Sequence, residues 1–197
     1  MNTVLASELL AMEKADLDMR EKLAADGSLF EGYHPQMKAV HDKNAIRLSE
    51  IIKKYGWPGK SMVGEEAAYA AWLVLQHAIA HPTLQRHCLT LLKPLVLTGE
   101  VGALEVAMLE DRIRSFEDKP QLYGTQFDWN EEGEMSPLPI DDPLLVDERR
   151  RQLGLRPLAE ETKQRRQYIQ TTPERPPKDL KSYKQERKNW LIANGWQ

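Results

Sequence analysis

The sequence predicts a mainly α fold, namely a single-domain helical bundle with one short β-prone segment and a C-terminal extension. Apolar residues recur with helical spacing in five successive segments, and proline or glycine separates these segments. One stretch, residues 120–127, has the composition of a strand. At 197 residues, the chain is long enough to bury one good core.

Residues 3–25 are predicted to form the first helix, because leucine and methionine follow the i, i+4, i+7 spacing of one buried face. Asp16 occupies a position on this face where an apolar residue is expected. Arg20 lies four residues later and is expected to reach Asp16 as an ion pair. The first helix therefore carries a charged pair at its buried face.

The second predicted helix covers residues 35–55 and begins at a proline, which suits the first helical position. His41 and Asn44 lie in line with Leu48 on its apolar face. An exposed helix would not need apolar residues in line with them. Both polar side chains are therefore expected to point into the core.

The turn over residues 56–59, Gly-Trp-Pro-Gly, ends the second helix, and residues 63–80 are predicted to form the third. This third helix is apolar almost all round, so it is expected to be the central helix of the bundle. Gln76 and His77 are the polar residues near its end.

Further helices are predicted over residues 82–97 and 101–116, and the second of these carries Asp111 and Arg112. The β-prone stretch follows, with Gly124 in its middle, and is expected to be a strand or an ordered loop across the bundle. Its polar side chains are those of Gln121, Tyr123, Thr125 and Gln126.

Proline and positive charge distinguish the end of the chain from the rest. After a loop over residues 128–143, short helices are expected to continue to residue 169. Residues 163–197 contain nine Lys/Arg and three acidic residues, a net charge of +6, so the rest carries −9 to give the formal total of −3. We predict a helical domain over residues 1–158 and a basic, helical or extended arm over residues 159–197.

Within the arm, three prolines in residues 170–178 predict an extended segment. Residues 179–194 then have an amphipathic pattern, with Trp190 and Leu191 on the apolar side. The opposite charges of arm and domain predict that the arm docks on its own domain or on a second subunit. A homodimer through the arm is the favoured alternative, because it satisfies both subunits symmetrically.

Composition argues against several classes of protein. The formal net charge of −3 argues against nucleic-acid binding by the helical domain. No apolar run approaches the roughly 20 residues of a membrane span, and acidic residues near the N-terminus are unlike a signal peptide. The single cysteine, Cys88, excludes an intramolecular disulfide and is expected to be a buried thiol rather than a nucleophile. The cytoplasm is the expected location.

The polar residues on apolar faces predict a pocket. Burying each without a partner would cost about 1–3 kcal/mol, so they are expected to meet one another, or a ligand, in one cavity. Taken singly, each is more often a satisfied core residue, but the recurrence on four helices favours a functional pocket. They are Asp16, Arg20, His41, Asn44, Gln76, His77, Asp111, Arg112, Gln121, Tyr123, Thr125 and Gln126.

Acid–base chemistry is the favoured function of this pocket. Histidine exchanges a proton near neutral pH, so His77 or His41 would act as the base, oriented by Asp111 or Asp16. The arginines would hold an anionic group, and the amides and the tyrosine would bind other polar atoms of the substrate. We predict a cofactor-free enzyme, a lyase, isomerase or hydrolase, that acts on a small polar or anionic molecule.

Two alternatives stay open. A metal-dependent hydrolase is the first, since His77 and His81 lie four residues apart and the dipeptide His41-Asp42 resembles that of metal phosphohydrolases. No third ligand has diagnostic spacing, so no metal is assigned. A non-catalytic module that binds a small molecule or a protein is the second. The sequence contains no phosphate-binding loop, nucleophile elbow or dinucleotide fingerprint.

Five motifs occur in a fixed order: Tyr55-Gly-Trp-Pro58, Ala71-Trp-Leu-Val-Leu-Gln-His-Ala78, Glu110-Asp-Arg112, Pro120-Gln-Leu-Tyr-Gly-Thr-Gln126 and Arg149-Arg-Arg-Gln-Leu-Gly-Leu155. Together they resemble an uncharacterised bacterial family that is catalogued as a domain of unknown function. The resemblance covers roughly residues 10–158 and includes Asp16, Arg20 and Asn44. It implies no activity, so the functional expectations rest on the residues themselves.

Overall fold

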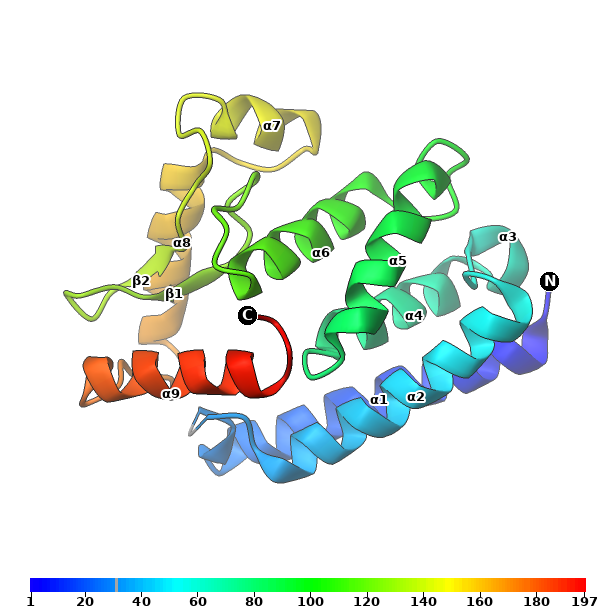
Figure 1. Cartoon of the computed structure of the whole chain (residues 1–197), viewed down its shortest axis with the longest axis horizontal. Helices are drawn as coiled ribbons and strands as arrows, with labels where there is room; N and C mark the ends of the chain where they lie inside the picture. Colours follow the sequence, from blue (N-terminus) through cyan, green and yellow to red (C-terminus); the bar gives the residue numbers. More distant parts are fainter. Residues whose placement is uncertain (31) are drawn as a thin grey trace. The chain divides into compact units, whose positions relative to one another are not determined.

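The structure is a computed structural model that describes residues 1–30 and 32–197, and most of these residues lie in helices (Figure 1). The prediction of a mainly helical fold is confirmed. The chain divides into two compact units, Met1–Val106 and Ala107–Gln197, with the boundary inside one helix. No helix in the described part of the chain combines the length and the apolar character that a membrane crossing requires.

The first unit is entirely helical. α1 and α2 run side by side in opposite directions (Figure 1). α4 contacts α1, α2, α3 and α5, so it is the central helix of this unit, as its apolar sequence predicts. The elements are α1 (Thr3–Ala25), the 3-10 helix η1 (Ser28–Phe30), α2 (Pro35–Tyr55), α3 (Lys60–Val63), α4 (Glu65–His77), α5 (Pro82–Leu95) and the start of α6 (Ala103–Phe116).

Small side chains let α4 pack closely against its neighbours. Ala67, Ala70 and Ala71 are buried, with at most 1% of their surface exposed. Trp72 adds a large buried ring, and its Nε1 donates a hydrogen bond of 2.9 Å to the backbone oxygen of Glu105. This bond fixes α4 to the start of α6.

The predicted third helix, residues 63–80, is divided and shortened in the structure. Gly64 separates α3 from α4, and its φ of +87° is a backbone conformation that other residues rarely adopt. α4 ends at His77, and Nε2 of Gln85 caps this end by donating to the backbone oxygens of Leu75 and Gln76, at 2.8 and 3.2 Å. A longer helix would use these two carbonyl groups itself.

The second unit contains the remainder of α6 and a small antiparallel sheet in which Phe127 pairs with Pro137 and Trp129 with Met135. Part of the segment predicted as a loop is therefore a hairpin. Asn130 explains its turn, since Oδ1 accepts hydrogen bonds from the backbone N–H groups of Glu132 and Glu134. The elements are β1 (Phe127–Trp129), β2 (Met135–Pro137), α7 (Val146–Gln152), α8 (Leu158–Gln170) and α9 (Leu180–Ala193).

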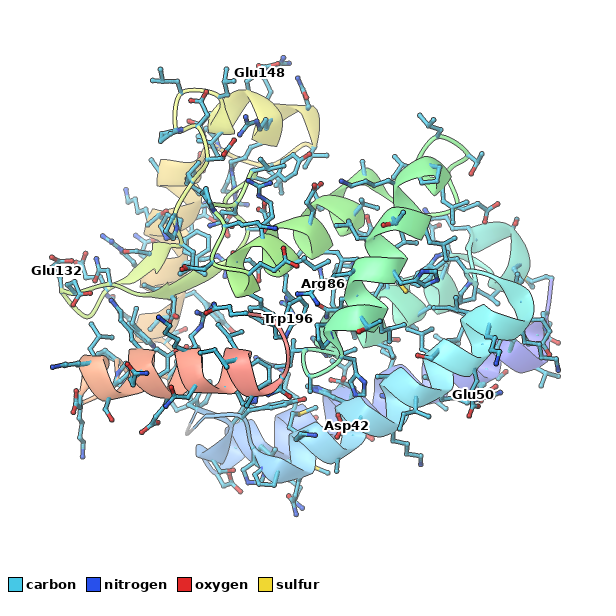
Figure 2. The ribbon with its side chains drawn as sticks, in the orientation of Figure 1. Asp42, Glu50, Arg86, Glu132, Glu148 and Trp196 are labelled. Carbon is cyan, nitrogen blue, oxygen red and sulfur yellow. The ribbon has the colours of Figure 1, made fainter. Side chains whose placement is uncertain are left out.

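The C-terminal arm folds back within the second unit. Tyr183 on α9 donates a hydrogen bond of 2.9 Å to Asp128 on β1. Trp196, which Figure 2 labels after α9, is 3% exposed, and its ring centroid lies 5.0 Å from that of Phe116. The arm thus docks on the chain to which it belongs, which is one of the two alternatives that the sequence left open. A homodimer stays a prediction.

We expect Leu191→Ala to lower the free energy of unfolding by about 2–4 kcal/mol, because Leu191 is 1% exposed and the smaller side chain leaves a cavity. Ile192→Ala is the matched control on the same helix, since Ile192 is 51% exposed, and we expect a change of less than about 0.5 kcal/mol. Urea unfolding followed by circular dichroism measures both. Equal effects of the two substitutions would show that α9 is not docked through Leu191.

Candidate functional site

A buried carboxylate, Asp16, lies between two imidazoles in the first unit. Nδ1 of His77 is 2.9 Å from both carboxylate oxygens, and Nε2 of His41 is 3.3 Å from Oδ2. The Asp16 side chain is 1% exposed, that of His41 9% and that of His77 23%. The cluster therefore leads from the core toward the surface, and His77 is its most accessible member.

Three different helices position this Asp16–His41–His77 cluster. Asp16 comes from α1, His41 from α2, and His77 is the last residue of α4. Asn44 holds α2 against α1, because its Nδ2 donates a buried hydrogen bond of 3.0 Å to the backbone oxygen of Met12, one turn before Asp16. Gln85 holds the end of α4, as described above, and so fixes the turn that carries His77.

The two imidazoles keep Asp16 ionised. Burial by itself raises the pKa of this carboxyl group, but the hydrogen bond with His77 and the close approach of both imidazoles lower it more, so that the pKa falls to about 2. An ionised carboxylate accepts hydrogen bonds and has none to donate. The proton in its bond with His77 therefore lies on Nδ1, and in the neutral imidazole Nε2 carries the lone pair.

Tyr33 extends the cluster beyond His41. Its hydroxyl lies 2.7 Å from Nδ1 of His41, and the two rings are stacked with centroids 5.6 Å apart. Burial, together with the negative charges of Asp42 and Asp16, raises the pKa of Tyr33 above its ordinary value, so the phenol stays protonated. The sequence analysis missed Tyr33 because it lies in a loop, where no periodicity marks a residue as inward-facing.

A second acid–histidine pair lies beside the cluster. Asp42, labelled on α2 in Figure 2, is 2.9 Å from Nε2 of His81 and 2.5 Å from Nζ of Lys38. His81 lies outside α4, at the N-cap of α5. The idea that His77 and His81 present two imidazoles on one helical face is therefore wrong. Asp42 likewise pairs with Lys38 and His81 rather than joining its neighbour His41.

Two further predicted residues of the first unit are Arg20 and Gln76. Arg20 is exposed, and among the described residues Asp16 is paired with His77 and His41 rather than with Arg20, so the expected ion pair is wrong. Arg20 is four residues from Asp16 on the same helix, a spacing that allows an ion pair. The two imidazoles bind Asp16 instead, because they point inward and reach its buried carboxylate. Gln76 is 2% exposed and lies in the core, as expected from α4.

In the second unit, Asp111 organises the loop that follows α6. It is fully buried, and its two oxygens accept hydrogen bonds from the backbone N–H groups of Leu122, Tyr123 and Thr125 at 2.7–3.2 Å. The hydroxyl of Thr125 adds a bond of 3.0 Å. Burial raises the pKa of Asp111 although these donors act in the opposite direction. Its contacts are those of a loop anchor.

The other predicted polar residues of the second unit also bond to this loop. Nε2 of Gln121 donates to the backbone oxygens of Gln126 and Leu138, both at 2.9 Å. Nε of Arg112 lies 3.3 Å from the side-chain oxygen of Gln126. Arg150, which the sequence analysis missed, is 2% exposed and donates to two carbonyl groups of the same loop. A single pocket that joins this loop to His41 and His77 stays a prediction.

A cavity of about 420 Å³ lies elsewhere in the first unit, lined by residues that include Glu13, Tyr69, Trp72 and Glu100. Glu100 has a structural partner there, since it accepts a hydrogen bond of 3.0 Å from the backbone N–H of Ser61. No member of the Asp16–His41–His77 cluster lines this cavity. The cluster and this cavity are therefore separate features of the unit.

The cluster has the donor types of a metal centre. Asp16, His41 and His77 each offer one ligand atom, and these atoms lie within 4.8 Å of one another. In the part of the chain that the structure describes, no other group of three such residues meets this spacing. Two imidazole nitrogens and a carboxylate oxygen suit a divalent transition metal better than calcium or magnesium.

The fold and the cluster define a mainly helical protein with a buried carboxylate–histidine centre. The chain belongs to DUF6624, a family of unknown function, whose sequence profile matches residues 3–169. The match confirms the resemblance to an uncharacterised family and extends it at both ends, while α9 lies beyond the matched residues. No curated protein and no solved structure matches the chain.

We expect Asp16→Asn to lower the free energy of unfolding by about 2 kcal/mol at neutral pH, since the folded-state pKa is about 2 and the ordinary value is 3.8. The lowered pKa stabilises the fold above the ordinary value, and this contribution disappears as the pH falls toward the folded-state value. The difference between wild type and variant should therefore shrink between about pH 4 and pH 2. Denaturant titrations in the presence of a chelator measure it.

Asp18→Asn serves as the control, because it removes an exposed carboxylate from the same helix. Its pair with Lys14 is a surface contact, for which we expect less than about 0.5 kcal/mol. A difference for Asp16→Asn that stays constant down to pH 2 would contradict the ionised state of Asp16.

Proposed function

We propose that this protein is an enzyme that acts on a small polar or anionic molecule by histidine-based acid–base catalysis. The centre is the cluster of Asp16, His41 and His77. The observation that supports this proposal is the placement of Asp16, whose two oxygens both lie 2.9 Å from Nδ1 of the partly exposed His77. A buried carboxylate that orients an accessible imidazole is a recurrent device for proton transfer at neutral pH.

The proposed base is Nε2 of His77. In the neutral imidazole this atom holds the lone pair, so it accepts a proton from the substrate or, in a hydrolase, from the attacking water. Asp16 stabilises the resulting imidazolium, because its negative charge is already in place and needs no rearrangement. The same proton is then returned to the product, which fits a lyase, an isomerase or a hydrolase.

His41 has a supporting role in this proposal. It is 9% exposed, and the Tyr33 hydroxyl at Nδ1 fixes the orientation of its ring. His41 therefore interacts with the Asp16 carboxylate from the buried side, and His77 contacts it from the more exposed side. The small-molecule ligand, a cytoplasmic setting and a homodimer are parts of the proposal that rest on the sequence.

The first test concerns the tautomer of His77. We expect neutral His77 to carry its proton on Nδ1, because Asp16 can only accept. Long-range proton–nitrogen correlation spectra of chelator-treated protein, recorded above neutral pH and assigned with a His77→Gln sample, report the tautomer. A proton found on Nε2 instead would remove the proposed base.

The second test concerns turnover. We expect the wild type to convert a member of a panel of phosphate esters, carboxylic acids and amides, with conversion followed by mass spectrometry. His77→Ala should reduce the rate about 10²–10⁴-fold, the range for loss of a general base. His81→Ala is the matched control, since it removes a neighbouring imidazole that pairs with Asp42, and it should retain most of the rate. Full conversion by both His77→Ala and His41→Ala would overturn the assignment of catalysis to this cluster. No conversion of any panel member by the wild type would favour a non-catalytic binding module.

A further inference from the structure

The donor atoms of the cluster lie close enough together to surround one ion, since all three are within 4.8 Å of one another. His77 Nδ1 lies 2.9 Å from Asp16 Oδ1, and His41 Nε2 lies 3.3 Å from Asp16 Oδ2. Nitrogen and oxygen ligands of zinc lie about 2.0–2.2 Å from the metal, which separates neighbouring ligands by roughly 3–3.5 Å. Both measured distances therefore allow an ion between the three side chains with small adjustments.

The inner imidazole supplies a second, independent observation. Nε2 of His41 is buried, and no described donor or acceptor meets hydrogen-bond geometry with it, although Asp16 lies 3.3 Å away. If Nδ1 carries the proton and donates it to Tyr33, the lone pair of Nε2 faces a negative carboxylate. If Nε2 carries the proton, its N–H is misaligned with that carboxylate. In the first case a cation placed between the two groups binds the Nε2 lone pair and the carboxylate, and in the second the proton must leave Nε2 before a cation can bind.

We propose that Asp16, His41 and His77 bind one divalent transition-metal ion of the zinc, iron(II) or manganese class. Imidazole nitrogens disfavour calcium and magnesium, which take oxygen ligands. Three protein ligands leave an open position for water or for an oxygen atom of the substrate. Tyr33 acts as the outer partner that orients His41 through Nδ1, a role that ligating histidines almost always require.

This inference deepens the proposed function and rests on it only for the catalytic consequence. Metal binding releases the proton of His77 Nδ1, so with the ion bound the acid–base group is the coordinated water, and the imidazoles hold the ion. The substrate class stays the same, since a small anion or a carbonyl group suits an open metal position. The metal-free protein keeps proton transfer at His77.

The pair of Asp42 and His81 is a control that the chain provides. It too has a carboxylate 2.9 Å from an imidazole nitrogen. Among the described residues it has no third metal-binding donor at the required spacing, and the ammonium of Lys38 lies 2.5 Å from the carboxylate, where its positive charge opposes a second cation. This pair is therefore expected to bind no ion, although it is a neighbour of the cluster in sequence.

The test uses the full chain, stripped with a chelator, dialysed and titrated with Co²⁺ by calorimetry and visible absorption. We expect one ion per chain, with the ligand-field absorption of a site that includes nitrogen donors. His77→Ala and His41→Ala should each weaken binding at least about 100-fold, and Tyr33→Phe about 10-fold, as for an outer partner. His81→Ala and Asp42→Asn should leave the affinity within about twofold. Circular dichroism verifies that each variant folds.

Absence of stoichiometric Co²⁺ binding to wild type would overturn the inference, as would an equal loss of affinity in His81→Ala and His77→Ala. Tyr33→Phe keeps the test decisive if a ligand variant fails to fold, because it removes a single hydroxyl group. The outcomes separate the two proposals. If no ion binds but His77→Ala abolishes turnover, acid–base catalysis stands alone. If the ion binds and His77→Ala retains full turnover, the metal site stands and the catalytic proposal fails.

Discussion

The buried charge of Asp16 is the constraint on which the first unit depends. Removing a partner from a buried ionised carboxylate lowers the free energy of unfolding by on the order of 3–5 kcal/mol. The groups around Asp16 must therefore be held in place. Those neighbours, His41 and His77, come from α2 and α4. The positions of α1, α2 and α4 therefore all depend on stabilising one buried negative charge. Asn44 and Gln85 contribute indirectly, because Asn44 bonds the backbone carbonyl of Met12, one turn before Asp16, and Gln85 bonds that of Gln76, next to His77.

Each unit contains a fully buried aspartate, and different kinds of hydrogen-bond donor surround the two carboxylates. Asp111 receives three backbone N–H groups and a hydroxyl, none of which changes charge near neutral pH. Asp16 receives imidazoles, which do. A carboxylate held by the backbone fixes the shape of a loop, whereas one held by imidazoles can respond to a proton or a cation. This difference separates a structural anchor from a reactive centre.

Periodicity predicted the helices and the inward orientation of Asp16, His41 and Asn44, because a buried stripe marks every residue that lies on it. It did not choose among the partners, since Asp16 was expected to pair with Arg20 and was one of two candidates for orienting His77 or His41. Choosing His77 over Arg20 for Asp16 requires the packing of α1 against α4, which no local pattern encodes. Tyr33 and Arg150 were not predicted for a related reason. Each lies at a position without an apolar stripe and hydrogen-bonds to a residue of another segment. The hairpin was missed because each of its strands has three residues.

The neighbours His41 and Asp42 serve different partners, one reaching Asp16 and the other reaching Lys38 and His81. Adjacent side chains of a helix point about 100° apart, so only one rotation of α2 about its axis allows the contacts of both His41 and Asp42. Sliding its sequence by one position would bring the Asp42 carboxylate against the Asp16 carboxylate. Like charges in a buried space repel strongly, which makes this alternative threading of α2 unfavourable. An insertion or deletion between the first turn of α2 and His41 is therefore expected to disturb both sets of contacts.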